Sequence, residues 1–152
     1  MMHNPENDHF KTDRHGQSYA GDHMLVELWG AKNLTDPTYI GASIRRAAHA
    51  AGATILHDHY HHFGDGQGVS GVTVLAESHI SIHTWPERGY AAIDIFMCGK
   101  CDPKDSMAVI EEAFTPDSIE INNIRRGLIG GKIRDGLQLN CMDNCVNFEC
   151  NS

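Results

Sequence analysis

The chain has 152 residues, a length that suits one domain with a sizeable core, and its hydrophobic content of 41% is ordinary for a globular protein. Its net charge of −8, from 12 basic and 20 acidic residues, repels phosphate backbones and anionic lipid surfaces. The composition therefore argues against nucleic acid and membranes as partners, and no apolar run is long enough to span a bilayer.

The first predicted element is a flexible polar tail over residues 1–20. This start lacks the apolar middle of a secretory signal, so we expect a cytoplasmic protein. Residues 23–31 follow as the first strand. Residues 35–52 are predicted to form a helix, because Asp36 can cap its start and Pro37 suits its first turn. The apolar residues of this helix recur on one face: Ile40, Ile44, Ala47, Ala48 and Ala51.

The rest of the chain is predicted to consist mainly of strands. A second Asp-Pro start predicts a helix over residues 102–114, and residues 131–152 show no clear period and stay unassigned. The inward face of that helix is predicted to carry Met107, Ile110, Ala113 and Phe114. Apolar runs predict strands at residues 53–63, 69–85 (one long strand or two abutting strands), 90–98 and 117–124.

The order of these elements is β-α-β-β-β-α-β. Short connections favour antiparallel pairing, and two helices can cover only one face of a sheet. We therefore predict an α+β fold, a two-layer sandwich of an antiparallel sheet with helices on one face. The uncovered face must meet water or a partner, and a homodimer is the simplest solution.

Reactive side chains are concentrated in residues 75–99. Because strand side chains alternate between faces, Ile80 and Ile82 share one face, and the other carries a polar row: His79, Ser81 and His83. Cys98 ends the next strand just before a glycine, where a side chain can reach a cleft. Taken singly, these residues are also explained as a solvated sheet face and a small buried thiol.

Two patterns raise the alternative of a metal site, and neither is favoured. His57, His59 and His61 share a strand face, but neighbours on one face stand about 7 Å apart, too far for all three to bind one ion without distortion. The C-x2-C pair Cys98 and Cys101 could join a downstream cysteine cluster to bind zinc. That cluster consists of Cys141, Cys145 and Cys150. The odd number of cysteines, five, also argues against a disulfide framework.

Four stretches carry a resemblance to a known family: "AGATIL" (51–56), "GVSG" (68–71), "ESHISIHTWPE" (77–87) and "GYAAIDIFMCG" (89–99). They resemble the prokaryotic S-adenosylmethionine decarboxylase proenzymes, whose pyruvoyl cofactor is made by self-cleavage. The resemblance extends over roughly residues 21–127. It implies a single domain over residues 1–152 that is cleaved into a β chain, residues 1–77, and an α chain, residues 78–152.

The resemblance also implies roles in self-cleavage. The Ser78 hydroxyl attacks the carbonyl of Glu77 to form an ester, and elimination and hydrolysis then leave a pyruvoyl group at position 78. His83 matches the histidine that removes the Ser78 α-proton, a role that suits an imidazole near neutral pH. Ser70 matches a serine that assists processing.

Three further matches and one added expectation concern the reaction on the substrate. Cys98 matches the cysteine that returns a proton to the substrate α-carbon after carbon dioxide leaves. Glu87 matches the carboxylate that accepts hydrogen bonds from both ribose hydroxyls. Phe63 matches an aromatic residue that stacks on adenine, and Trp85 is expected to line the same pocket, where an aromatic face attracts the cationic sulfonium.

The leading functional hypothesis is pyruvoyl-dependent decarboxylation of S-adenosylmethionine for the synthesis of the polyamine spermidine. A first alternative keeps this chemistry but uses ornithine or arginine, which would leave Phe63 and Glu87 without partners. A second alternative is a non-catalytic homologue that binds a nucleoside and regulates another enzyme. The expected partners are S-adenosylmethionine and a second copy of the chain.

Overall fold

The computed structural model describes residues 9–130. A six-stranded antiparallel sheet forms its framework, with the strand order β4-β5-β6-β7-β3-β8. The strands of this sheet are β3 (Gly21–Trp29), β4 (Ile55–His62), β5 (Val69–Leu75), β6 (Ser78–Trp85), β7 (Tyr90–Cys98) and β8 (Ser118–Arg126). The helices are α1 (Pro37–Ala50) and α2 (Met107–Phe114), with 3₁₀ turns at Pro86–Arg88 and Pro103–Ser106.

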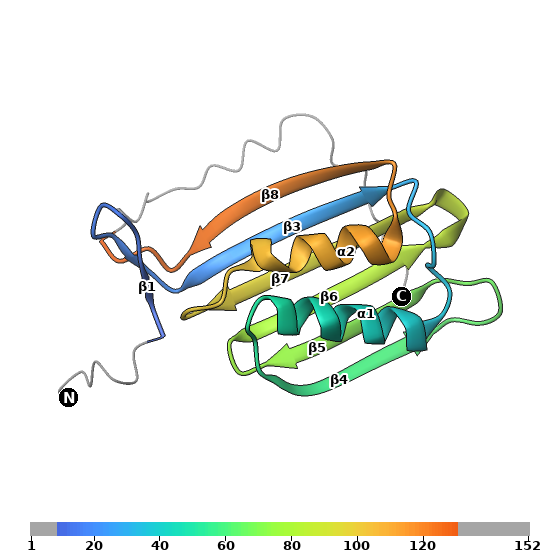
Figure 1. Cartoon of the computed structure of the whole chain (residues 1–152), viewed down its shortest axis with the longest axis horizontal. Coiled ribbons are helices and arrows are strands. Elements are labelled where there is room, and N and C mark those ends of the chain that lie inside the picture. The colour runs from blue at the N-terminus through green and yellow to red at the C-terminus, as the bar shows by residue number, and fades with distance from the viewer. Residues whose placement is uncertain (1–8, 131–152) are drawn as a thin grey trace, which may run out of the picture.

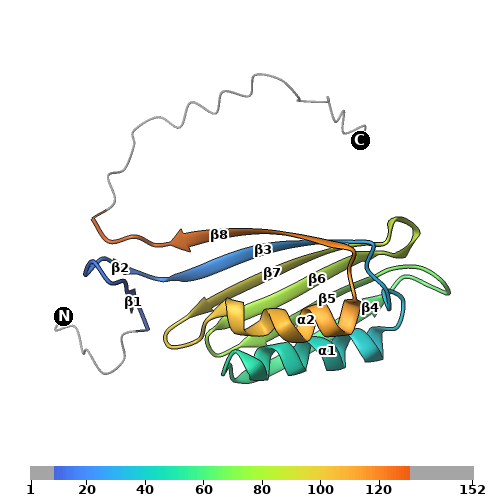
Figure 2. The same cartoon turned by 45° about the horizontal axis from the view of Figure 1, so that its top comes forward.

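Both α-helices lie side by side on one face of the sheet, and the other face carries no helix from the described residues (Figures 1 and 2). The predicted α+β two-layer sandwich is therefore confirmed. The core lies between the layers, where the helix residues predicted to face inward are buried. Within that layer the Ser106 hydroxyl donates to the Ala47 carbonyl at 3.0 Å, which ties the start of α2 to α1.

The predicted helix start and strand faces agree with the structure. Asp36 caps α1 by accepting hydrogen bonds from the backbone amides of Thr38 and Tyr39. In β6, Ile80 and Ile82 are fully buried against the helices, and the alternate side chains face the open side. The strand pattern in the sequence thus determines which side chains face the helices.

Residues 69–85 are predicted to form one long strand or two abutting strands, and the structure confirms two. β5 and β6 form a hairpin whose two-residue turn is Ala76–Glu77, with Leu75 paired to Ser78. The turn contains no Gly, Pro, Asn or Asp, so the residues that normally reveal a hairpin in a sequence are missing there.

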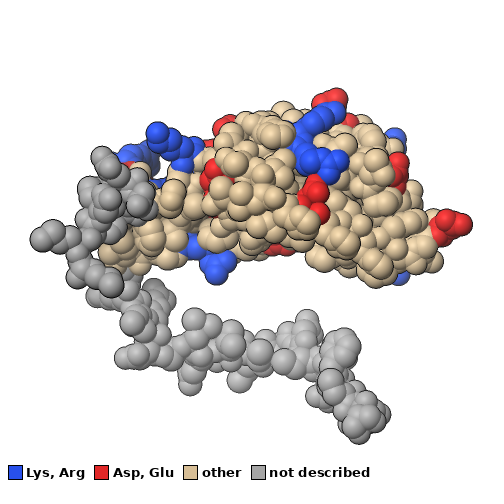
Figure 3. All heavy atoms as spheres, turned by 90° about the horizontal axis from the view of Figure 1, so that it is seen from below, with Lys and Arg blue, Asp and Glu red and all other residues tan. Residues whose placement is uncertain are grey.

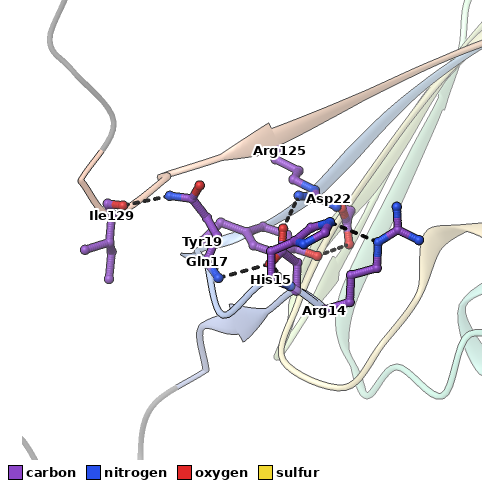
Figure 4. A network of polar contacts seen from close by, with 8 residues as sticks. Arg14, His15, Gln17, Tyr19, Asp22, Arg125 and Ile129 are labelled. Atoms are coloured by element: carbon purple, nitrogen blue, oxygen red, sulfur yellow. Dashed lines mark hydrogen bonds and ion pairs between the residues drawn. The ribbon is translucent and has the colours of Figure 1, made fainter.

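The N-terminal region also differs from its prediction. Residues 9–20, expected as part of a flexible tail, contain a small hairpin of β1 (Lys11–Thr12) and β2 (Ser18–Tyr19). Long-range contacts join this hairpin to β8 and to the residues that follow β8 (Figure 4). Arg125 pairs with Asp13 at 2.7 Å, and the Gln17 side-chain amide donates to the Ile129 carbonyl at 2.9 Å. Lys11 also pairs with Asp22 at 2.8 Å.

Some predictions fall outside the described residues, namely those for residues 1–8 and for the cysteine-bearing segment 131–152. Within residues 9–130, no helix is long and apolar enough to cross a bilayer. Seen from below, acidic and basic side chains are interspersed over a surface that is mostly neither (Figure 3).

The packing between the layers gives a stability prediction. Phe114, at the end of α2, is fully buried, so Phe114→Ala should lower the free energy of unfolding by about 3–5 kcal/mol. Glu111→Ala, at an exposed position of the same helix, is the matched control and should change it by less than about 0.5 kcal/mol. Denaturant unfolding followed by circular dichroism measures both, and equal effects would contradict this account of the core.

Candidate functional site

A cavity of about 360 Å³ lies at the end of β6 where the chain enters the Pro86–Arg88 turn. Five of the predicted site residues line it together: Phe63, Ser70, His83, Trp85 and Glu87. The other lining residues are Gln67, Gly68 and Thr84. Two separate stretches of the sequence, residues 63–70 and 83–87, thus converge on one cavity.

The register of the sheet places Ser70 and His83 directly opposite each other on β5 and β6. The Ser70 hydroxyl lies 2.8 Å from Nδ1 of His83, a hydrogen bond that orients the imidazole. Thr84 anchors this end of the hairpin from the buried side, because its hydroxyl donates to the Leu34 carbonyl at 2.7 Å and accepts from the Val69 amide at 2.8 Å.

Glycine is required where the floor of the cavity meets the neighbouring strand. A Cβ at Gly68 would lie 2.0 Å from the Thr84 carbonyl oxygen, so only glycine permits this close approach. The wall is aromatic: Trp85 stacks on Tyr90 with ring centroids 5.1 Å apart, and Phe63 packs edge-on against His61 at 4.8 Å. The cavity therefore combines flat apolar walls with one carboxylate, Glu87.

The predicted cleavage site lies elsewhere on the sheet. Glu77 is in the turn before β6, Ser78 is the first residue of that strand, and Cys98 is the last residue of the neighbouring strand β7. The backbone amide of Cys98 donates to the carbonyl of Glu77 at 3.0 Å, which polarises the carbonyl of the peptide bond between Glu77 and Ser78.

The backbone at Ser78 is strained. Its φ is 141°, a value that residues other than glycine rarely adopt. Such a conformation costs about 1–3 kcal/mol and persists only where the surrounding structure holds it. The strain therefore lies at the N–Cα bond of Ser78, next to the peptide bond that is predicted to be cleaved.

The predicted site residues thus form two groups in one chain. Ser78 and His83 are five residues apart on β6, which corresponds to about 17 Å along an extended strand. Ser78, Glu77 and Cys98 form one group, and the cavity residues form the other. Within a single chain, His83 is too far away to remove the Ser78 α-proton.

A polar cluster lies between these groups on the open face of the sheet, which is the face that no helix of the described residues covers. The sequence did not identify this cluster as a site. Nε2 of His23 lies 3.1 Å from Asp94, whose other oxygen accepts a 3.4 Å hydrogen bond from Ser81. His79 and His23 meet edge to face with ring centroids 6.2 Å apart. The alternation of β7 puts Asp94 on the same face as Cys98, but its pairing with His23 depends on the register with β3, which the sequence does not encode locally.

Two groups on this face have shifted acidities. Burial and the nearby charges of His23 and Arg126 lower the pKa of His79, against an opposing effect of Asp94. The pKa of Tyr90 is raised to about 12, mainly because its hydroxyl donates to the Glu27 carboxylate.

A second cavity of about 300 Å³ adjoins Ser70 and His83 and includes His59 and His61 in its lining.

Comparison with known proteins gives consistent similarities. Residues 22–127 match the family model described as S-adenosylmethionine decarboxylase. An S-adenosylmethionine decarboxylase proenzyme of Methanococcus maripaludis is 44% identical over 119 residues, which cover 76% of this chain and 97% of that protein. One of Thermomicrobium roseum is 42% identical over 110 residues, covering 72% and 95%. The crystal structure of the adenosylmethionine decarboxylase from Aquifex aeolicus superimposes with a TM-score of 0.67 at 33% identity, covering 75% and 96%.

The lowered pKa of His79 gives a pH prediction. The unfolded state takes up this proton near the ordinary pKa of 6.5 and the folded state only at lower pH, so stability should fall as the pH drops through that window. His79→Gln should therefore show a smaller loss of melting temperature between about pH 7.5 and about pH 5.5 than the parent chain. His49→Gln, at an exposed position of α1, is the control, and an unchanged loss in His79→Gln would contradict the assignment.

Proposed function

The chain belongs to the S-adenosylmethionine decarboxylase family, and we propose that it cleaves itself between Glu77 and Ser78 and then decarboxylates S-adenosylmethionine. One observation carries the cleavage: Ser78 is held at a φ of 141° directly after a carbonyl that accepts a hydrogen bond from the Cys98 amide. A polarised carbonyl followed by a residue with a strained φ favours attack by the adjacent hydroxyl.

The cleavage reaction balances without any external reagent except water. The Ser78 oxygen attacks the Glu77 carbonyl carbon, the C–N bond breaks, and an ester and a free amine result. Removal of the Ser78 α-proton by His83 expels the main-chain α-carboxylate of Glu77 and leaves dehydroalanine. Water then replaces the nitrogen, ammonia leaves, and a pyruvoyl group remains at position 78. Serine is needed because its β-oxygen both forms the ester and departs with it.

The residues around Ser78 fit such a group. It would be held at the start of β6, beside Cys98, by the pairing of Ser78 with Leu75 and Met97. When formed, it supplies the electron sink that decarboxylation of an amino acid requires and that ordinary side chains lack. Cys98 is assigned to return a proton from its thiol to the substrate α-carbon after carbon dioxide has left.

The second group of residues is suited to the nucleoside part of the substrate. We assign Glu87 to accept hydrogen bonds from both ribose hydroxyls, because a carboxylate offers two acceptor oxygens. We assign Phe63 to stack on adenine and Trp85 to line the same pocket. Phe63 is 60% exposed in one chain, so its ring presents a free face to a ligand. Ornithine and arginine carry neither an adenine ring to stack on Phe63 nor a ribose diol to bind Glu87.

The separation of the two groups supports a shared site in a homodimer. If two open faces stack about a twofold axis that runs across the strands near Ser81, the Ser78 end of each chain meets the His83 end of the other. His83 of one protomer would then act on Ser78 of its partner. Large hydrophobic side chains on the open face are exposed in one chain, and this dimer interface would bury them. They are Trp29, Val72, Val74, Trp85 and Ile124.

The product of this reaction is decarboxylated S-adenosylmethionine (S-adenosylmethioninamine), an aminopropyl donor. We assign the enzyme to the cytoplasm and to spermidine biosynthesis, where such a donor is consumed.

Purified protein tests the cleavage and the substrate together. Mass spectrometry should find residues 1–77 and a second fragment that begins with a blocked residue 78. The cleaved protein should release carbon dioxide from S-adenosylmethionine but not from ornithine or arginine. Ser78→Ala should stay intact and inactive, because no hydroxyl remains to form the ester. Two fragments from Ser78→Ala, or release from ornithine alone, would refute the proposal.

Mixed dimers test the shared site. Ser78→Ala and His83→Ala should each remain uncleaved when expressed alone. When they are coexpressed, a mixed dimer contains one complete site, built from Ser78 of the His83→Ala chain and His83 of the Ser78→Ala chain. About half of randomly assorted dimers are mixed, so about half of the His83→Ala chains should be cleaved. If no His83→Ala chain is cleaved on coexpression, each site lies within one chain and the dimer proposal fails.

A further inference from the structure

The turn that precedes Ser78 has an unusual composition. Two-residue hairpin turns normally match the twist of their strands by placing one or both turn residues at positive φ, which favours Gly, Asn or Asp. Here the turn is Ala76–Glu77, and neither residue has a positive φ. The positive φ falls instead on Ser78, the next residue, at 141°. The unfavourable backbone conformation thus falls on the residue that directly follows the bond proposed to break.

In addition to the hydrogen bond from the Cys98 amide, two hydrogen bonds with Thr54 hold the turn in place. The carboxylate of Glu77 accepts a hydrogen bond from the Thr54 amide at 2.8 Å, and the Ala76 amide donates to the Thr54 carbonyl at 2.9 Å. Hydrogen bonds to a charged acceptor are the stronger kind. Thr54 directly precedes β4, whose pairing with β5 begins at Ile55 and Leu75, so the anchor is part of the sheet framework.

We propose that the Glu77 side chain is a positioning residue for self-cleavage, which holds the turn so that Ser78 stays strained until its peptide bond is attacked. This inference rests on the proposed cleavage between Glu77 and Ser78. The main-chain carbonyl of Glu77 is the reacting group, whereas the side-chain carboxylate of Glu77 acts at a distance through the Thr54 amide. The two ends of one residue thus have separate tasks.

The strain acts on the first chemical step. The angle φ of Ser78 is a rotation about its N–Cα bond that is defined by the carbonyl carbon of Glu77. When that carbon moves from nitrogen to the Ser78 oxygen, the nitrogen becomes a free amine and the constraint disappears. The strain therefore raises the free energy of the amide form alone and shifts the equilibrium between amide and ester toward the ester.

A near-isosteric pair of substitutions isolates the hydrogen bond. Glu77→Gln keeps an oxygen that can accept from the Thr54 amide, whereas Glu77→Met has a similar length and no such acceptor. Both are made in a His83→Ala chain, which should stall at the ester. Hydroxylamine cleaves esters and spares amides, so the fraction of chain that it splits under denaturing conditions measures the ester.

Glu77→Met should lower the ester fraction by about threefold or more, while Glu77→Gln should stay within about twofold of the His83→Ala parent. A residue that only stabilised the fold would not change this fraction in the folded protein, which is isolated by gel filtration before treatment. Ester fractions at the level of the His83→Ala parent in both variants would overturn the proposal. Fractions that are equally low in both variants would also overturn it, because the hydrogen bond alone would then not be responsible.

A time course in the chain with His83 intact gives a second measurement. Pulse-labelled protein from cell-free synthesis should be cleaved at least about threefold more slowly with Glu77→Met than with Glu77→Gln or with the exposed control Glu111→Ala. Cleavage of all four chains at one rate, including the parent, would refute the positioning role and leave the proposed function intact. A parent chain that remains whole would refute the proposed function itself.

Discussion

The strict alternation of side chains along the strands is the constraint on which the rest of this structure depends. In β6 and β7 the apolar residues Ile80, Ile82, Ile93 and Ile95 are fully or almost fully buried beneath the helices. Their burial leaves the intervening residues no choice of side, so His83 and the polar groups around Asp94 must face away from the core. A slip of one residue would exchange the two sets, and hydrophobic burial therefore fixes the chemistry of the open face.

The same regularity explains why one chain carries its reactive residues in two groups. An extended strand advances about 3.3 Å per residue, so residues that are close in sequence are separated rapidly in space. Ser78 and His83 lie on a single straight strand, and no bend brings them together. The proposed twofold axis across the strands would solve this problem without any change in the chain, because it would reverse the strand direction in the second copy. The face that no helix of the described residues covers and the divided site would then have a common explanation.

Much of the fold could be predicted because its signals are local. Asp36 and Pro37 mark a helix start, and the alternation in β6 and β7 shows which residues are buried. The N-terminal hairpin could not be predicted, because its contacts, such as Arg125 with Asp13, join residues more than one hundred positions apart. The convergence of Phe63 and Glu87 on one cavity agrees with their expected proximity, but only the register between strands shows that Ser78 lies far from both.

The ambiguity over residues 69–85, between one long strand and two abutting strands, has a physical cause that connects the sequence with the proposed reaction. The sequence permits a continuous strand through Ala76 and Glu77 because neither residue favours a turn. A hairpin turn without a positive φ in its two residues must adopt an unfavourable backbone angle nearby, and here that angle is the φ of Ser78. A turn of Asn-Gly would have been easy to recognise in the sequence and would have allowed the following residue to relax. Sequence reasoning therefore fails at the position where local preference and native conformation disagree, and such disagreement is expected where a protein stores strain for a function.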